Sequence, residues 1–349
     1  MSRFDIKDFF SKREDTRDET FDVLKGVAII FVIMGHCGVG PLRAFFFSFH
    51  MPLFFFITGY FLKKRPLGKE IGLSLKRLII PYVFSAVCIF LAAAIRNYAD
   101  NAWVDISYTK GYVIKFLLGF NGEAHPAWLD GTIMAFWFLW AMFWGRALVV
   151  FLLGKIQSIK ILCIIFFFLG PFGVFLGENI FIPYCVPLGI TAAGFIYVGY
   201  LANQCKLLES VKVFKFFPLL LICWLYDWMQ NGMDMAHFWY PSGYVFDLLG
   251  ALGAFFVLFR FVKTFCCKDS LFWRIICFCG RYSLVVFCVH AIDENLNNWL
   301  VFVSCLHIPF EYRGAFLLLT RLVITFVIAL FILKVKLLRE GVFQIKNDL

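Results

Sequence analysis

Ten apolar runs, each close to the length that crosses a lipid bilayer, dominate this sequence. A membrane-spanning helix needs about 20 mostly apolar residues, whereas a spanning β-strand alternates apolar and polar residues. Runs such as FFFSFHMPLFFFITGYFL show no alternation. The sequence therefore predicts an all-α integral membrane protein, a bundle of about ten transmembrane helices, at residues 23–41, 45–62, 78–95, 132–153, 159–176, 182–201, 214–230, 244–262, 273–292 and 314–334.

The composition agrees with a lipid environment. Hydrophobic residues make up 62% of the chain and charged residues 16%, whereas a soluble domain has about 45–50% and about 25%. The net charge of +10 does not indicate a nucleic-acid partner, because the basic residues lie in short blocks between the apolar runs and form no binding motif. Most of the 12 cysteines lie inside apolar runs, where a free cysteine behaves as a small hydrophobe.

Lysine and arginine are unevenly shared between the connections. Cytoplasmic segments of membrane proteins are rich in both residues. If both termini are cytoplasmic, 24 of the 33 lysine and arginine residues lie in cytoplasmic segments, five lie on the opposite side, and four lie within spans or at their ends. This predicts an even number of spans and two cytoplasmic termini, with a tail at 1–22, a transmembrane domain at 23–336 and a second tail at 337–349. The highly charged first tail is followed by no small-residue cleavage site, so we expect no cleavable signal peptide.

The first predicted span carries two ionisable side chains, Lys25 and His36. Ionisable groups inside a span are costly, and they are functional candidates by default. The spacing of the two residues is close to three helical turns, so they share one helix face about 16 Å apart. A structural alternative has Lys25 extending its ammonium group to the interface and His36 hydrogen-bonded to a neighbouring helix.

His50 lies near the outer end of the second predicted span. Because the connection between the two spans is short, His36 and His50 are predicted at similar depth on neighbouring antiparallel helices. Pro52 disfavours regular helix beside His50, which membrane proteins tolerate where the backbone lines a cavity. Two histidines at one depth favour a functional site, since a neutral imidazole can take a proton from an attacking hydroxyl group.

Five patches follow one another along the chain: DVLKGVAIIFVIMGH, FFFSFHMPLFFFITGYF, KRLIIPY, FWFL and GRYSLVVFCVH. In this order, from Asp22 to His290, they resemble the large family of integral-membrane acyltransferases, and among its members the fucose 4-O-acetylase-like group. The strongest signals are the basic residue followed by ten residues and a histidine, and the Phe-His-Met-Pro sequence. The resemblance implies an enzyme that moves an acetyl group from acetyl-CoA to a hydroxyl group of a cell-envelope or exported saccharide.

The resemblance also implies roles for individual residues. His36 matches the essential histidine of the family and becomes the candidate general base, and His50 becomes a second catalytic candidate. Lys25 and Arg77 match two basic positions. Many members carry two arginines three residues apart at the second of these positions, whereas this chain has Ser74 three residues before Arg77.

The acyl donor is expected at the cytoplasmic face, where Lys25, Lys76 and Arg77 would meet the phosphates of CoA. Anchoring by the positive-inside rule explains Lys76 equally well. The thioester would reach His36, which would act either as a general base or as a nucleophile that forms an acyl-histidine. We expect no metal, because no cluster of histidine or carboxylate has ligand spacing in the sequence.

The expected partners are a saccharide acceptor (a polysaccharide, lipid-linked glycan or glycolipid) and the lipid bilayer, and the expected location is a bacterial inner membrane. Trp137 and Arg281 to Ser283 match family positions without a firm role. His290 matches a histidine that is often present in the family, and a structural role is at least as well supported. We do not expect the remaining histidines, His125, His237 and His307, to function.

Two other functions fit parts of the sequence. A secondary transporter of a sugar or lipid-linked precursor would use a broken helix, and Pro183, Pro187, Gly189 and Gly194 could break the span at 182–201. A membrane scaffold would need no polar cavity around His36. The longest outer connection, at 96–131, is acidic and aromatic, which suits either a bound sugar or an ordinary solvated loop.

Overall fold

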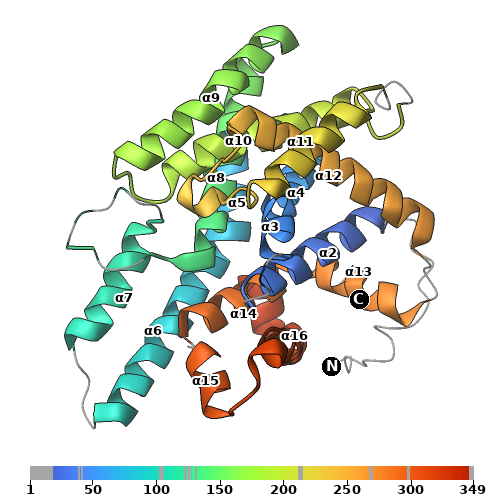
Figure 1. Ribbon diagram of the computed structural model, residues 1–349. Coiled ribbons are helices and arrows are strands. Elements are labelled where there is room, and N and C mark those ends of the chain that lie inside the picture. The colour runs from blue at the N-terminus through green and yellow to red at the C-terminus, as the bar shows by residue number, and fades with distance from the viewer. Residues whose placement is uncertain are drawn as a thin grey trace.

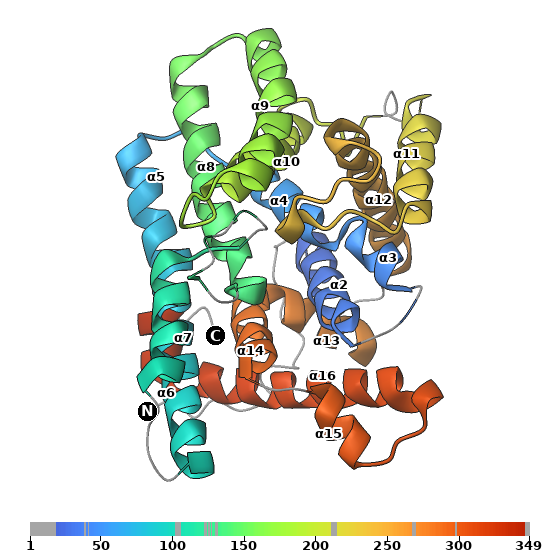
Figure 2. The ribbon, with the colours of Figure 1, turned by 60° about the vertical axis from the view of Figure 1, so that its left-hand side comes forward.

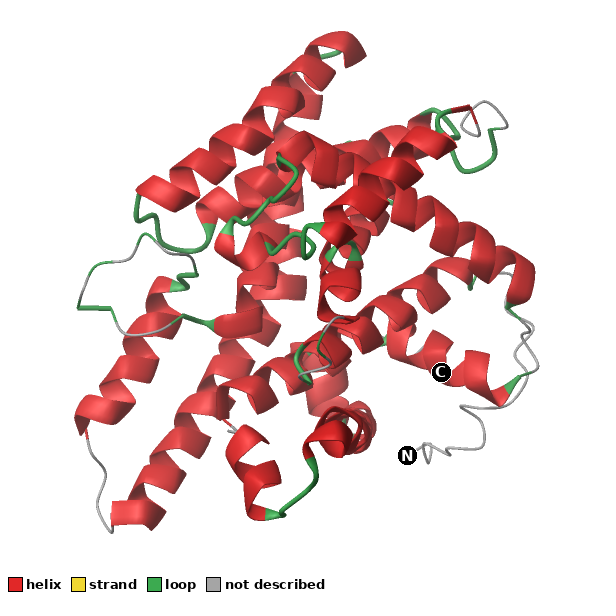
Figure 3. Cartoon of the chain, viewed as in Figure 1, coloured by secondary structure: helices red, strands yellow, loops and turns green. Residues whose placement is uncertain are grey.

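The computed structural model describes residues 19–37, 40, 42–101, 106–121, 124, 126, 128–129, 132–210, 215–266, 270–296 and 299–345. Within these ranges the protein is all-α, as predicted: helices joined by loops, with no strand (Figure 3). The one extended pairing among them is an isolated antiparallel bridge between Asp234 and Trp239.

Figure 1 shows the arrangement of the helices. The α-helices are α2 (Thr20–Gly35), α3 (Leu42–Phe47), α4 (His50–Tyr60), α5 (Leu67–Ser74), α6 (Ile80–Asn101), α7 (Ile106–Leu118), α8 (Trp137–Lys155), α9 (Ile159–Asn179), α10 (Val186–Gln204), α11 (Phe217–Met229), α12 (Tyr244–Phe265), α13 (Leu271–Arg281), α14 (Ser283–Leu296), α15 (Trp299–Cys305) and α16 (Phe310–Lys334). Short 3-10 turns are η2 (Met134–Phe136) and η4 (Met235–His237), and the π-helical turns are η1 (Leu75–Ile79) and η5 (Leu337–Val342).

All ten predicted spans fall on helices, but the count of ten is not confirmed. Seven helical segments of the described chain are long and apolar enough to cross a membrane, or eight if α13 and α14, bent by 78°, form one broken span. The two other predicted spans correspond to α2, with 16 residues, and α11, with 13 residues. Both are shorter than the length that crosses a bilayer without help from neighbours. The cytoplasmic side of the termini stays a prediction.

The break in the membrane domain occurs at a different place from the expected one. Pro187 occupies the first turn of α10, where proline is tolerated, so this helix continues unbroken to Gln204. The interruption lies instead at Arg281 to Ser283, between α13 and α14. The sequence feature that favoured a transporter was a break in this helix, and the structure shows no break within α10.

Most of the described residues in the connection predicted at 96–131 are helical. No proline or glycine occurs between Tyr82 and Asn101, so α6 continues past its apolar part, and α7 begins at Ile106. Asp105, Glu123, His125 and Asp130, which made this connection acidic and polar, lie outside the described residues.

Inner and outer helices differ in burial. The apolar windows of α3–α4, α8, α10 and α12 are between 61% and 72% buried inside the protein, whereas those of α5–α6, α9 and α16 are between 22% and 33% buried. The apolar surface of the outer group therefore faces the lipid. Figure 2 shows α16 lying crosswise below α14 and α13.

Helix α2 packs very closely against α13. A Cβ atom added to Gly280 would stand only 1.6 Å from the carbonyl oxygen of Asp22, so only glycine allows this approach of the two backbones. Because α13 leads directly into α14, the contact sets where α14 begins relative to α2.

We expect Gly280→Val to destabilise the fold, because the added side chain must separate α2 from α13, and overpacking costs about 1–3 kcal/mol or more. The readout is the midpoint of thermal unfolding of the full chain in detergent. Gly72→Val is the matched control, since nothing lies within 4 Å of its added Cβ atom. Equal midpoints for the two variants would contradict this account of the contact.

Candidate active site

A cavity of about 270 Å³ lies at the end of α2. Its wall is built from six parts of the chain: the end of α2, the α3–α4 region, Asn121 after α7, the residues around the start of α8, the loop between α11 and α12, and α14. The polar and aromatic side chains on this wall include His36, Arg43, His50, Asn121, Trp137 and Asp234.

His36 is the first residue beyond the last turn of α2. The glycine-rich sequence that begins at Gly35 is a helix stop signal, so His36 caps the helix and its ring is 29% exposed. Its Nδ1 atom lies 2.7 Å from Oε1 of Glu294 on α14. A carboxylate at this distance is a strong hydrogen-bond partner, and it fixes the direction of the imidazole ring.

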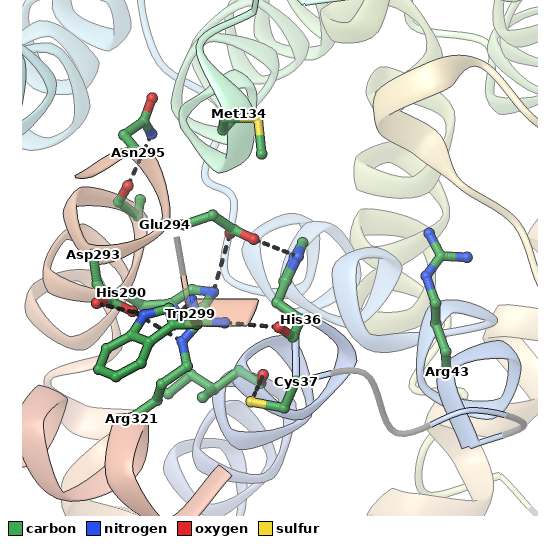
Figure 4. A network of polar contacts seen from close by, with 12 residues as sticks. His36, Cys37, Arg43, Met134, His290, Asp293, Glu294, Asn295, Trp299 and Arg321 are labelled. Atoms are coloured by element: carbon green, nitrogen blue, oxygen red, sulfur yellow. Dashed lines mark hydrogen bonds and ion pairs between the residues drawn. The ribbon is translucent and has the colours of Figure 1, made fainter. Parts of the chain in front are cut away.

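Glu294 bridges two histidines. Its second oxygen, Oε2, lies 3.5 Å from Nε2 of His290, one turn earlier on α14. His290 is completely buried, and its ring centre is 5.4 Å from that of His36. The signal for His290 was present in the sequence, and the structure adds that it stands beside His36 (Figure 4).

Arg321 on α16 contacts both His36 and His290. Its guanidinium donates to the carbonyl oxygen of His36 at 2.7 Å and to Oδ2 of Asp293 at 2.9 Å. Its third nitrogen lies 3.4 Å from Nδ1 of His290. Asp293 also accepts from the indole of Trp299. The buried cation is thus paired and hydrogen-bonded, as a charge in this environment requires.

The contacts of His36 and His290 indicate which ring nitrogen of each histidine carries the proton. Arg321 has only donors, so Nδ1 of His290 accepts and the proton of that ring sits on Nε2, facing Glu294. The carboxylate of Glu294 has only acceptors, so Nδ1 of His36 carries the proton of that ring. Nε2 of His36 is then left with its lone pair, as a general base requires.

His50 lines the same cavity as His36, which fits their predicted common depth. It is buried, and its Nδ1 atom donates to the carbonyl oxygen of Phe46 at 2.5 Å. The ring of Phe47 lies 6.0 Å from that of His36 and 4.9 Å from that of His50. The direct partner of His36 is therefore Glu294 and not His50.

Comparison of the sequence with known protein families identifies a family of acyltransferases. The model of the acyltransferase domain family, Acyl_transf_3, matches residues 18–334, which is most of the chain and includes every residue of this site. This chain belongs to that family.

One relative of this acyltransferase is the nodulation protein NolL from Sinorhizobium fredii (strain NBRC 101917 / NGR234). The two sequences are 26% identical over 248 residues, which cover 64% of this chain and 62% of NolL. The chain therefore matches less than two thirds of the length of this relative. No solved structure matches the acyltransferase.

The three residues expected to bind the donor do not form one cluster. The ammonium of Lys25 pairs with the buried carboxylate of Asp22 at 2.8 Å, on a helix that packs mainly against α13. Lys76 and Arg77 are exposed on the π-helical turn η1, which packs against α5, α6 and α8. A π-helical turn inside a longer helix often marks a functional position.

A buried ion-pair network stands beside this turn. Glu70 is fully buried and pairs with Arg146 at 2.6 Å and with Arg65 at 3.3 Å. It also accepts from Ser74 at 3.1 Å. Ser74, the residue at which the sequence departs from the resemblance, is thus a partner of Glu70.

Glu294, Asp293 and Arg321 were not predicted as site residues. Two signals could have found them. Arg321 interrupts the apolar run of the last span, and a charge inside a span is a functional candidate. Glu294 follows His290 by four residues, so both face the same side of a helix.

The argument against a metal from sequence spacing is wrong for the folded chain, because His36, His290 and Glu294 bring three possible ligand atoms within 4.8 Å of one another. The fixed positive charge of Arg321 beside His290 opposes a cation there. The absence of a metal from the reaction stays a prediction.

We expect Glu294→Gln to lower the rate of acyl transfer by about 10²–10⁴-fold, the usual contribution of a general base. A glutamine amide can donate to Nδ1 of His36, which moves the ring proton to Nε2 and removes the lone pair from the cavity. The rate is measured at saturating donor, with Glu178→Gln on the exposed end of α9 as the control for loss of a negative charge. A wild-type rate in Glu294→Gln would contradict the tautomer assignment.

Proposed function

We propose that this membrane acyltransferase moves an acetyl group from acetyl-CoA to a hydroxyl group of a cell-envelope or exported saccharide, with His36 as the general base. The observation that carries the proposal is the 2.7 Å contact of Glu294 with His36, which lines a cavity, in a chain of the acyltransferase family. A histidine oriented by a carboxylate is the arrangement that activates a hydroxyl group in acyl transfer.

In the proposed reaction, Nε2 of His36 removes the proton of the acceptor hydroxyl while its oxygen attacks the thioester carbonyl carbon. Glu294 stabilises the imidazolium that forms. The tetrahedral intermediate then expels the CoA sulfur, which takes the proton from His36. One C–O bond forms, one C–S bond breaks, and His36 returns to its neutral form. Attack by His36 itself, through an acyl-histidine, is the alternative that the arrangement leaves open.

The proposed donor site uses the basic residues at the predicted cytoplasmic face. The exposed cations of Lys76 and Arg77 stand on the π-helical turn, beside the buried network of Glu70 and Arg146. The phosphates of CoA would bind there through charge-assisted hydrogen bonds. Lys25 has a weaker claim, because Asp22 already neutralises it.

The proposed location is a bacterial inner membrane. The apolar helices support a multi-pass membrane protein, and NolL comes from a bacterium. The saccharide acceptor rests on the family resemblance of the sequence motifs and on the polar and aromatic character of the cavity wall.

We expect His36→Ala to abolish transfer of radiolabelled acetyl from acetyl-CoA into the saccharide fraction of membranes that contain the protein. The protein level in the membrane should not change, because His36 follows the helix and is partly exposed. His307→Ala, at an exposed position outside the site, is the matched control. Transfer by His36→Ala at the wild-type level would rule out His36 as the base.

We expect Lys76→Ala and Arg77→Ala to raise the KM for acetyl-CoA by about tenfold or more, since a hydrogen bond to a charged group contributes about 1.5–3 kcal/mol. Lys25→Ala tests its place in the donor site in the same way. Lys155→Ala is the control, being an exposed lysine at the end of α8. A KM for acetyl-CoA equal to that of the control would remove the residue from the donor site.

A further inference from the structure

Three ionisable side chains form a second polar cluster on the cavity wall, separate from the Glu294 network. Asp234, in the loop between α11 and α12, has its Oδ2 atom 3.1 Å from the guanidinium of Arg43 and 3.2 Å from Nδ1 of His237. The guanidinium of Arg43 also lies over the ring of Phe47, 3.8 Å from its centre. Figure 4 shows Arg43 on the side of His36 away from Glu294.

The cluster is held in place by backbone contacts. Oδ1 of Asp234 accepts from the backbone N–H of Ala236 at 3.2 Å, and Asn121 donates to the carbonyl oxygen of Ala236 at 2.8 Å. Gly232 has a φ of +72°, and a Cβ atom there would stand 2.4 Å from the carbonyl oxygen of Ala44. The loop is therefore fixed against α3 and against the segment before α8, so the polar groups are arranged before any ligand binds.

The cluster keeps hydrogen-bonding capacity for a ligand. Arg43 uses one guanidinium nitrogen on Asp234, and its other N–H groups have no hydrogen-bond partner among the described residues. A carboxylate has about four acceptor positions, and contacts with the described residues occupy three of those of Asp234. Burial tends to raise the pKa of Asp234, but the hydrogen bond from His237 and the charges of His237 and Arg43 outweigh it, so the pKa is lowered.

We propose that Arg43, Asp234 and His237 recognise the acceptor as a single neutral sugar unit; this inference rests on the proposed function. Sugar hydroxyls can donate to Asp234 and accept from Arg43, while the apolar face of the ring packs against Trp137 or Phe47 on the same wall. The carboxylate of Asp234 lies 3.1 Å from the guanidinium of Arg43. The carboxylate of an acidic sugar that contacts Arg43 would therefore also stand beside Asp234, and this repulsion disfavours it.

The size of the cavity agrees with one sugar unit. Its volume of about 270 Å³ is close to the lower end of the about 300–1,000 Å³ of small-molecule sites. His36 lies on the same wall, so a sugar held by the cluster presents its hydroxyl groups to the proposed base.

The first test separates recognition from catalysis. With saturating acetyl-CoA and a titrated saccharide acceptor, we expect Asp234→Asn and Arg43→Lys to raise the KM for the acceptor by about tenfold or more, as for a lost hydrogen bond to a charged group. The KM for acetyl-CoA should not change. Arg43→Lys keeps the charge but loses the planar fork, and Glu178→Gln is the control. A wild-type acceptor KM in both variants, with or without a lower kcat, overturns the proposal.

The second test needs no transfer activity. Binding of the methyl glycosides of glucose and galactose to the purified full chain is compared with binding of the matching methyl uronides. We expect the wild type to prefer the neutral glycosides and Asp234→Asn to lose that preference. Preference for the uronides, or no binding of any neutral glycoside, overturns the proposal. Neutral-sugar binding without acetyl transfer would reject the proposed function and leave the recognition site standing.

Discussion

The site depends on one buried cation, Arg321, which ties three helices together at the end of α2. It binds the carbonyl oxygen of His36, the carboxylate of Asp293 on α14 and the ring of His290 from its own position on α16. In a medium of low polarity an unpaired guanidinium would be very unfavourable. The requirement that this charge be fully paired brings α2, α14 and α16 to one point, and the Glu294 bridge between two histidines forms there.

The two histidine–carboxylate contacts of the cavity have different surroundings. The pair of His36 and Glu294 is supported by helices, with a buried arginine and a second histidine behind it. The pair of His237 and Asp234 stands on a loop, with the ring of His237 half exposed. Groups that take part in chemistry need a fixed geometry, whereas groups at a cavity mouth can exchange water for a ligand. Under the proposed function, the arrangement separates proton transfer at His36 from acceptor recognition at Asp234.

Much of the fold follows from the apolar runs, and the remainder depends on contacts that sequence periodicity cannot express. The ten runs predicted helices at the right places, and the motif residues His36 and His50 line one cavity. The bend between α13 and α14 falls inside one predicted span, and it lies next to the close packing of Gly280 against α2, a contact that hydrophobic periodicity does not express. Glu294 and Arg321 acquire their positions only when α14 and α16 meet the end of α2, and those residues are far apart in the chain.

The loop between α11 and α12 has a consequence for how such a protein can diversify. It contributes Asp234 and His237 to the cavity but none of the groups that hold His36. Its backbone is held by Gly232 against α3 and by Asn121, just after α7, and its side chains Met233, Met235 and Phe238 are buried in the core. Under the proposed function, replacing Asp234 and His237 alone would change which acceptor the cavity takes, while the helices that orient His36 stay as they are. If this loop recognises the acceptor as proposed, acceptor preference and proton transfer can change independently, because they depend on different parts of the chain.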